Sequence, residues 1–281
     1  MTRTPTHSPA FPDLSESEFR LFNRLIYDRS GIHLEMQKMP LVRARLLKRL
    51  RALGLTSFRK YYEFLTQNDS GEEQVQLLNA ISTNLTQFFR DAEHFDFLKT
   101  TFFPKWRNEP RIRILSAGCS SGEEAYSIAM TAREFFGDAT QTKVQIDAGD
   151  ICTRVLDHAV KGVYRAAKLQ TISRERLQNF FLQGTGAYDG LVAVAPEVKS
   201  MVEFRYLNLM KPLAPDVHYH AIFCRNVAIY FDRATQQAVF KRLSQALVSG
   251  GTLLLGQSES MASSSGTFKY IQAAVYENRK S

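Results

Sequence analysis

One short segment constrains the fold of this chain more than any other. Residues 111–115 alternate polar and apolar side chains and run directly into a loop of small residues with glycines at 118 and 122. A helical pattern begins at Glu123. The order of strand, glycine turn and helix start predicts a parallel α/β unit. The N–H groups at the helix start are unpaired, and the glycines let the backbone approach a ligand closely. Such a unit can accommodate a nucleotide-like ligand.

The first helical residues after this loop narrow the class of ligand. Glu123 and Glu124 are favourable there, because a helix N-terminus carries partial positive charge. The same carboxylates would repel a pyrophosphate, so a ligand with hydroxyl groups and a positive centre, such as S-adenosylmethionine, fits better. The loop lacks the full G-x-G-x-x-G spacing, and similar junctions occur in α/β domains without a ligand. The loop alone leaves both interpretations open.

The N-terminal third of the chain shows only helical periodicity. Ser15 and Glu18 have the spacing of a capping box at the start of the first helix. Gly31 and Gly54 are placed to end the first and second helices. We therefore expect helices at about residues 15–30, 40–53, 58–65 and 72–81.

From residue 111 onward, strands alternate with helices, which predicts a doubly wound, largely parallel sheet with helices on both faces. A glycine-rich segment at 184–194 interrupts this order and predicts a small β-hairpin before the third strand. The expected strands are 112–115, 144–148, 202–206, 221–224 and 252–255, with a late one near 271–276; the expected helices are 123–136, 153–160 and 234–247.

These patterns predict an all-helical domain followed by an α/β domain. Pro104 and Pro110 bracket a connection between the two. The expected boundaries are a disordered leader at 1–13, a helical N-terminal domain at 14–90, a linker at 91–110, and an α/β domain at 111–281 with a β-subdomain inserted at about 180–200.

The distribution of charge indicates an acidic partner. The formal charge is +8, which is compatible with nucleic acid, a membrane surface or an acidic protein. Between Lys38 and Lys60 there are eight basic residues and no acidic one, and a helical wheel places Arg45, Lys48 and Arg51 opposite the apolar side. Aromatic residues are not interleaved with these charges as in a single-strand nucleic-acid groove. A solvated basic face is the simplest explanation, but we expect docking to an acidic protein surface.

The cysteines and the apolar runs indicate the cellular compartment that we expect for this protein. Cys119, Cys152 and Cys224 lack C-x-x-C spacing and follow apolar runs, so we expect reduced structural thiols in a cytoplasmic protein and no metal site. No stretch approaches the roughly 18 apolar residues of a membrane span. Residues 1–10 lack the apolar core of a signal peptide. We expect no membrane insertion.

Polar residues stand at the ends of the predicted strands, where ligands bind in a doubly wound sheet. Asp150 ends the second strand about thirty residues after the glycine loop, a position that suits a carboxylate accepting hydrogen bonds from ribose hydroxyls. Asn208 follows the third strand, and Arg225 and Asn226 follow the fourth. Each also has a structural explanation, such as capping the next helix for Asp150 or forming a turn for Asn208. Polar groups at all four strand ends favour a site.

Four segments together resemble the chemotaxis methyltransferases of the CheR family. The resemblance extends from about Phe19 to Tyr276, in the same order and with similar spacing. It implies a helical N-terminal domain and a methyltransferase domain dependent on S-adenosylmethionine, with a small inserted β-subdomain. The segments are TNLTQFFR at 83–90, SAGCSSGEEAYS at 116–127, Gly149-Asp150, and CRNVAIYF at 224–231.

The resemblance also implies an activity and a set of site residues. The activity is methyl-ester formation on glutamate side chains of chemoreceptor cytoplasmic helices, with S-adenosylhomocysteine as the product. Arg90 and Tyr230 would lie near the transferring methyl group, and the basic second helix would face the cytoplasmic domain of the receptor. The implied cofactor-binding residues are Asn84, Thr86, Arg90, Gly118, Glu124, Asp150, Asn208, Leu209, Arg225 and Asn226.

The chain departs from the family pattern at two places. Cys152 stands where many relatives have a second acidic residue, so contacts to the adenosine can differ. Ala193 and Ala195 stand where relatives that tether to receptors resemble a Val-Arg-Val-Arg pattern, which argues against docking to a C-terminal receptor pentapeptide.

Two other functions compete with this interpretation. A nucleic-acid methyltransferase would place an Asn/Asp-Pro-Pro-aromatic run after the fourth strand, where this chain has Arg-Asn-Val-Ala. A module that senses S-adenosylmethionine or S-adenosylhomocysteine without catalysis would not need Arg90 and Tyr230.

Overall fold

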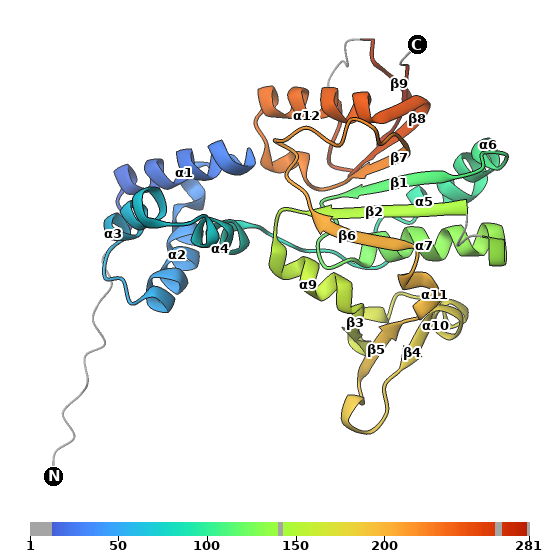
Figure 1. Cartoon of the computed structure of the whole chain (residues 1–281), viewed down its shortest axis with the longest axis horizontal. Coiled ribbons are helices and arrows are strands. Elements are labelled where there is room, and N and C mark those ends of the chain that lie inside the picture. The colour runs from blue at the N-terminus through green and yellow to red at the C-terminus, as the bar shows by residue number, and fades with distance from the viewer. Residues whose placement is uncertain (1–12, 140–142, 262–265, 280–281) are drawn as a thin grey trace. The chain divides into compact units, whose positions relative to one another are not determined.

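The computed structural model describes residues 13–139, 143–261 and 266–279. The disordered leader expected at 1–13 therefore lies outside the described residues, apart from Asp13. The chain divides into two compact units, Met1–Thr83 and Asn84–Ser281, which we describe separately (Figure 1).

The first unit is helical throughout its described part. The predicted capping box is present, because the Ser15 hydroxyl accepts from the Glu18 N–H at 3.3 Å and the Glu18 carboxylate accepts from the Ser15 N–H at 2.9 Å. Gly31 and Gly54 end two helices in the left-handed conformation. The elements are α1 (Glu16–Ser30), η1 (Met36–Lys38), α2 (Met39–Leu53), α3 (Phe58–Glu63), the π-helical η2 (Phe64–Asn68) and α4 (Glu72–Ile81).

A buried carboxylate ties three of these helices together. Glu73 of α4 accepts two hydrogen bonds from Arg49 of α2, at 2.8 and 2.6 Å, and one from the Tyr61 hydroxyl of α3 at 2.7 Å. Glu73 is buried, and Tyr61 also packs against Phe22 of α1. The helical unit therefore has an apolar core with one paired ionic group inside it.

The second unit is built on a seven-stranded sheet with the order β6-β2-β1-β7-β8-β10-β9. The first five strands in this order are parallel, and β10 is antiparallel to both of its neighbours. The strands of this sheet are β1 (Ile112–Ala117), β2 (Val144–Asp150), β6 (Val202–Tyr206), β7 (Tyr219–Cys224), β8 (Leu247–Leu255), β9 (Phe268–Gln272) and β10 (Val275–Asn278).

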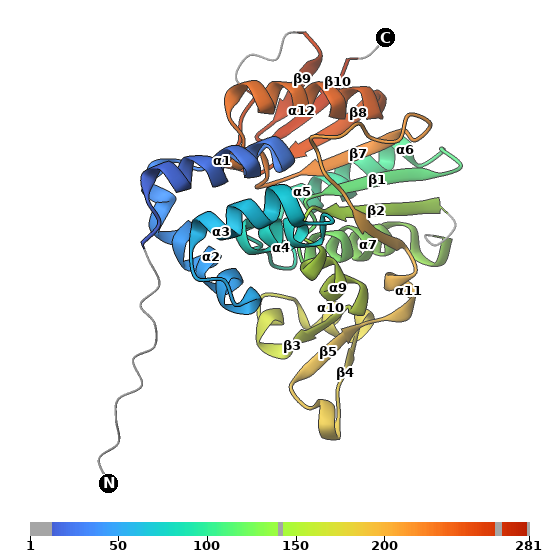
Figure 2. The ribbon, with the colours of Figure 1, turned by 60° about the vertical axis from the view of Figure 1, so that its left-hand side comes forward.

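Helices cover both faces of the sheet, as the alternating pattern predicts. Ile112 and Ile114 of β1 belong to a core cluster that includes residues of α7 (Glu123–Phe136). Leu115 belongs to a second cluster with residues of α12 (Arg233–Ala246). Successive strand residues point to opposite faces, so the two helices lie on opposite sides (Figure 2). The doubly wound fold is confirmed.

The inserted β-subdomain is a separate antiparallel sheet with the order β3-β5-β4. Figure 1 shows it on the side of the unit away from β8 and β9. The segment 184–194 predicted as a hairpin contains β5 and the turn before it, whereas β4 ends at Gln183 and β3 lies about twenty residues earlier. The elements of this region are α9 (Thr153–Lys161), β3 (Val163–Arg165), η5 (Ala166–Leu169), α10 (Arg174–Phe180), β4 (Phe181–Gln183), η6 (Gly186–Tyr188), β5 (Leu191–Val194) and α11 (Pro196–Lys199).

Two regions differ from the sequence expectation. Most of the segment expected as a linker, 91–110, is helical, and its phenylalanines 95, 97, 102 and 103 are buried in the core of the second unit. The single late strand expected near 271–276 is two strands, because Ala274 adopts a left-handed turn with φ 58°. The remaining elements are α5 (Glu93–Phe97), the π-helical η3 (Leu98–Phe102), α6 (Phe103–Trp106), η4 (Gly137–Ala139) and η7 (Ala228–Tyr230). Over the described ranges, no helix is both long and apolar enough to cross a membrane.

Candidate functional site

The candidate site lies at the carboxyl ends of the parallel strands. The strands β1, β2, β6, β7 and β8 are parallel neighbours, so their carboxyl ends meet at one edge of the sheet. Gly118 follows β1, Asp150 ends β2 and Arg225 follows β7. The topology therefore brings together residues that the sequence analysis selected separately.

Asp150 fixes the glycine loop. One carboxylate oxygen accepts the N–H of Ser120 at 2.8 Å, and the other accepts the N–H of Cys152 at 2.8 Å. The second bond forms a turn before α9, whose N-cap is Cys152 and has no side-chain cap, so Asp150 does not cap this helix. Each carboxylate oxygen has two lone pairs, so both can accept a further donor.

Gly118 is required by its surroundings. Its φ of 91° is a conformation that side-chain-bearing residues rarely adopt, and a Cβ at this position would collide with Cγ2 of Val227. The glycine therefore lets the loop after β1 lie directly against the segment after β7.

Arg225 joins three segments through its guanidinium group and is 5% exposed. Its Nη1 donates to Glu124 at 3.0 Å, while its Nη2 donates to the Arg90 carbonyl at 2.6 Å and to the Asp91 carboxylate at 2.5 Å. Because a buried cation is tolerated only with partners, these bonds hold the chain near Arg90 at the strand edge. The Arg90 side chain itself is half-buried and donates to the Leu85 carbonyl at 3.1 Å.

The segment around Asn84 and Phe89 is attached to the same loop and helix. Ser120 Oγ donates to the Asn84 carbonyl at 3.2 Å, and the Phe89 N–H donates to Ser127 Oγ of α7 at 2.9 Å. The Nδ2 of Asn84 is buried and has no hydrogen-bond partner within the described chain. A buried donor of this kind is costly unless a ligand satisfies it.

Strained backbone is concentrated at this edge. Of the five non-glycine residues with positive φ in the described ranges, four lie in the segments just described: Phe89, Asp91, Ser120 and Asn226. Such conformations persist where surrounding contacts enforce them, and they cluster at functional sites. We therefore take this edge as the candidate site.

The two central carboxyl groups have perturbed acidities. Burial raises the pKa of Glu124, while attraction to the Arg225 guanidinium and a bond from Ser116 Oγ at 2.7 Å oppose the rise. Burial also raises the pKa of Asp150, opposed by bonds from backbone N–H groups, the strongest from Cys152. Carboxylates held out of water in this way gain from a ligand that carries hydroxyl or ammonium donors.

Four more of the selected residues lie in a turn, in the core or at half-buried positions. Asn208 accepts the Met210 N–H at 2.9 Å, as in an ordinary turn. The Leu209 side chain is buried in the cluster that contains α12 residues. Thr86 is half-buried, and Tyr230 is half-buried at the end of η7.

Three residues that the sequence analysis did not select belong to the site. Glu259 follows β8 and accepts backbone N–H groups of Asn226 and Ile229. The strand-end rule applied to the fifth strand would have found it. Asp91 adjoins the 83–90 motif and pairs with Arg225. His94 is buried, and no sequence pattern marks it.

The cysteines behave as structural thiols. All three are buried and form no disulfide bond. Burial raises the pKa of Cys119 and Cys224 well above the usual range, so both thiols are neutral at physiological pH. The described part of the chain contains no group of three or more metal-ligating side chains.

The basic helix α2 belongs to the first unit. Lys48 and Arg51 are exposed, whereas Arg45 is half-buried. The Arg45 guanidinium donates to the Ile81 carbonyl, at the end of α4, and to Thr83 Oγ1 at 3.1 Å. Arg45 therefore stabilises the end of the helical unit rather than extending into solvent as the helical wheel indicates.

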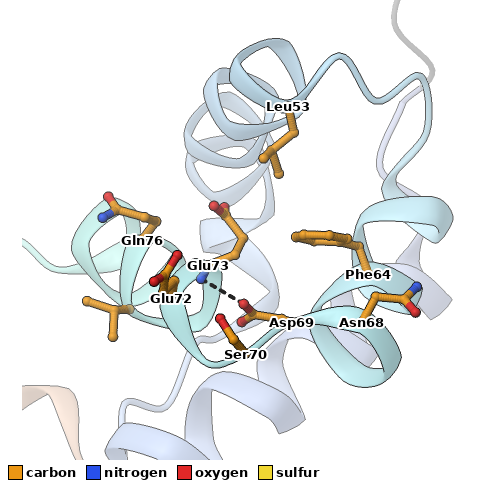
Figure 3. A pocket seen from close by; sticks show the side chains of 9 residues that line it. Leu53, Phe64, Asn68, Asp69, Ser70, Glu72, Glu73 and Gln76 are labelled. Atoms are coloured by element: carbon orange, nitrogen blue, oxygen red, sulfur yellow. Dashed lines mark hydrogen bonds between the residues drawn. The ribbon is translucent and has the colours of Figure 1, made fainter.

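The first unit also contains a pocket of about 530 Å³ around the start of α4 (Figure 3). Two of its acidic lining residues are engaged within the fold: Asp69 accepts the N–H groups of Glu73 and Gln74 at 3.0 and 2.8 Å, and Glu73 is the partner of Arg49. The third, Glu72, is exposed. None of the residues selected from the sequence lines this pocket.

Comparison with known proteins gives a match over most of each unit. The family described as "CheR methyltransferase, all-alpha domain" matches residues 17–82, and "CheR methyltransferase, SAM binding domain" matches residues 84–276. The chain belongs to the CheR methyltransferase family. Its sequence is 41% identical over 264 residues to the chemotaxis protein methyltransferase of Salmonella typhimurium, covering 94% of this chain and 90% of that protein.

Other CheR relatives are of similar length. The Escherichia coli chemotaxis protein methyltransferase is 40% identical, with 94% of this chain and 91% of that protein covered. Chemotaxis protein methyltransferase 2 of Pseudomonas aeruginosa is 38% identical, with 97% and 98% covered. Membership of the CheR family identifies the second unit as the part that binds S-adenosylmethionine, in agreement with the ligand class deduced from the glycine loop.

His94 makes the CheR site sensitive to acid. Burial, with repulsion from the Arg225 guanidinium, lowers the pKa of His94 to about 4. The unfolded chain binds this proton below about pH 6.5, and the folded protein does not bind it until about pH 4. The contribution of His94 should therefore lower the free energy of unfolding by roughly 2–3 kcal/mol as the pH falls from 7 to 4. Urea unfolding of His94→Gln should show a shallower loss of stability over this range than the parent. An identical pH slope for the two proteins would contradict this origin.

Proposed function

We propose that this protein transfers a methyl group from S-adenosylmethionine to glutamate side-chain carboxylates on the cytoplasmic helices of chemoreceptors. The resulting methyl esters would serve sensory adaptation. The observation that carries the proposal is the buried Arg225 bridge, which holds the Arg90 segment at the strand edge beside Glu124. Relatives named chemotaxis protein methyltransferases over nearly the whole chain support it.

The residues at the strand edge fit the proposed methyl donor. The unpartnered Nδ2 of Asn84 would donate to a ligand acceptor, and the remaining lone pairs of Asp150 would accept from ribose hydroxyls. Gly118 lets the loop after β1 pack against Val227, which brings the two segments to one strand edge, and Glu124 would place negative charge where the ligand is positive. Bound S-adenosylmethionine supplies an electrophilic methyl group on a positively charged sulfur.

The protein's own part in the transfer is alignment and exclusion of water. A glutamate carboxylate is ionised at neutral pH, so it needs no general base to become a nucleophile. The Arg90 guanidinium has five N–H donors and uses one bond to reach the Leu85 carbonyl, so it can also hold a substrate carboxylate. Tyr230 would shape the opposite wall of the pocket. Orientation and desolvation of this kind supply the larger part of such a rate enhancement.

The basic face of α2 fits an acidic protein helix bundle. Lys48 and Arg51 are exposed on one helix with no acidic neighbour between residues 38 and 60. Positive groups of this kind attract an acidic partner and set its orientation more than they add affinity. Arg45 would contribute to docking indirectly, because it fixes the backbone at the end of α4.

The substrate class is tested with tritiated S-adenosylmethionine and three acceptors. We expect base-labile methyl label on a chemoreceptor cytoplasmic fragment and none on DNA or RNA, because methyl esters hydrolyse in mild alkali and N-methyl groups do not. A receptor fragment with its acidic helix positions changed to glutamine is the control. Tight binding of S-adenosylhomocysteine without label on any acceptor would instead support a sensor. Label on nucleic acid would overturn the proposal.

The role of Arg90 is tested with Arg90→Ala. Loss of the guanidinium should lower the turnover number for receptor methylation about 10²-fold or more, because the nucleophile is no longer aligned. The exposed Arg107→Ala is the matched control and should keep parental turnover. Calorimetry with S-adenosylhomocysteine separates alignment from cofactor binding. Full methyl transfer by Arg90→Ala with unchanged cofactor binding would remove Arg90 from the mechanism.

Docking through α2 is tested by reversing Lys48 and Arg51 to glutamate together. The new negative charges should repel an acidic receptor and lower kcat/KM about tenfold at low salt, with the difference shrinking as ionic strength rises. The affinity for S-adenosylhomocysteine should not change. Reversal of the exposed pair Arg233 and Lys241 on α12 makes the same change in net charge and should leave turnover intact. Equal losses from both pairs would mean that net charge, not α2, is responsible.

A further inference from the structure

Glu259 is a buried carboxylate that binds backbone from two segments. Its Oε2 accepts the N–H groups of Asn226 at 2.8 Å and Gly256 at 2.7 Å, and its Oε1 accepts the N–H of Ile229 at 3.1 Å. Glu259 is 7% exposed. It therefore connects the turn after β8 to the segment 226–230 after β7, and we call these three bonds the Glu259 clamp.

The surrounding backbone is shaped for the Glu259 clamp. Asn226 adopts φ 58°, a conformation that is unfavourable for a residue with a side chain and that directs its N–H to the carboxylate. At residue 256 a Cβ would lie 2.8 Å from Glu259 Oε2 and 2.7 Å from Asn226 Nδ2, so any other residue there would displace both side chains. The left-handed Asn226 and the closely packed Gly256 thus both donate their N–H groups to one carboxylate.

The segment 226–230 has its other end fixed as well. Gln236 of α12 donates to the carbonyl groups of Ala228 and Phe231, at 2.8 and 3.2 Å. The Glu259 clamp holds the N–H groups of Asn226 and Ile229, and Gln236 holds the carbonyl groups of Ala228 and Phe231. The stretch fixed in this way carries Asn226 and Tyr230, the two residues proposed to contact the cofactor and to line the transfer pocket.

The chemistry of the Glu259 clamp requires a carboxylate. An ionised carboxylate only accepts hydrogen bonds, so both oxygens can face N–H groups. A glutamine would keep one oxygen, which can serve Asn226 and Gly256, but its NH₂ group would then face the N–H of Ile229. Glu259→Gln therefore places two hydrogen-bond donors, its NH₂ group and the Ile229 N–H, against each other. It opens no cavity, because the two side chains have the same size.

We propose that Glu259 is a positioning residue for methyl transfer, acting through the segment that carries Asn226 and Tyr230. This inference rests on the function proposed above. Glu259 neither touches the substrate nor moves a proton; its three bonds set the direction in which Tyr230 enters the pocket. Displacement of that segment by about 1 Å would cost up to about 10²-fold in turnover.

The first test compares Glu259→Gln with Glu277→Gln in the full chain. Glu277 lies on β10, outside the site. Its partly exposed carboxylate is paired with Lys105 of α6. Glu259→Gln should lower kcat for receptor methylation 10- to 100-fold with a smaller change in KM for the receptor, and Glu277→Gln should match the parent. Amide hydrogen exchange should accelerate in 226–231 and leave β1 protected. Parental exchange and turnover in Glu259→Gln would overturn the proposal.

The second test asks whether Glu259 acts through Tyr230. In a double-mutant cycle with Tyr230→Phe, the effect of Glu259→Gln on kcat should largely disappear in the Tyr230→Phe background, because both changes disable the same group. Additive losses would assign Glu259 to general stability and contradict positioning. If the parental protein methylates no receptor, the proposed function fails. The hydrogen-exchange comparison and S-adenosylhomocysteine binding would still decide the effect of Glu259 on the segment.

Discussion

The arrangement of the site depends on one buried cation. Arg225 is almost completely buried; its Nη1 and Nη2 donate to Glu124, to Asp91 and to the Arg90 carbonyl, and its Nε is buried without a partner in the described chain. Desolvation of a charge costs several kcal/mol, which only close partners can offset. The segment that carries Arg90 therefore cannot move away from β7 without leaving an unpaired charge in the interior. A residue expected to contact the cofactor therefore also fixes the segment that carries Arg90.

The strained residues of the site follow a common rule. Each of the four left-handed positions is bonded by one polar side chain from another segment. Each conformation costs of the order of 1–3 kcal/mol by itself, so the partner is what makes it persist. The pairs are Phe89 with Ser127, Asp91 with Arg225, Ser120 with Asp150, and Asn226 with Glu259.

The sequence predicts the features that local chemistry determines. Ser15, Glu18 and Gly54 mark helix ends by their own hydrogen bonds and backbone preferences, and the structure confirms them. The hairpin at Ala274 could not be predicted, because alanine gives no turn signal. In the site, the strand-end rule found Asp150 and Arg225. The hydrogen bond between Arg225 and Glu124 joins residues 101 positions apart. It arises from the sheet order, and neither segment alone predicts it.

The structure also changes the interpretation of the glycine loop. Asp150 looks from the sequence like a ligand-binding carboxylate, yet it already holds Ser120 and Cys152. Because a carboxylate can accept about four hydrogen bonds, the two functions are compatible, and the same residue can fix the loop and bind a ribose. Substituting Asp150 would disturb both at once. Arg90 contributes only its carbonyl to the Arg225 bridge, while its guanidinium donates to the Leu85 carbonyl, so the role proposed for the side chain can be tested separately from the role of the backbone in the fold.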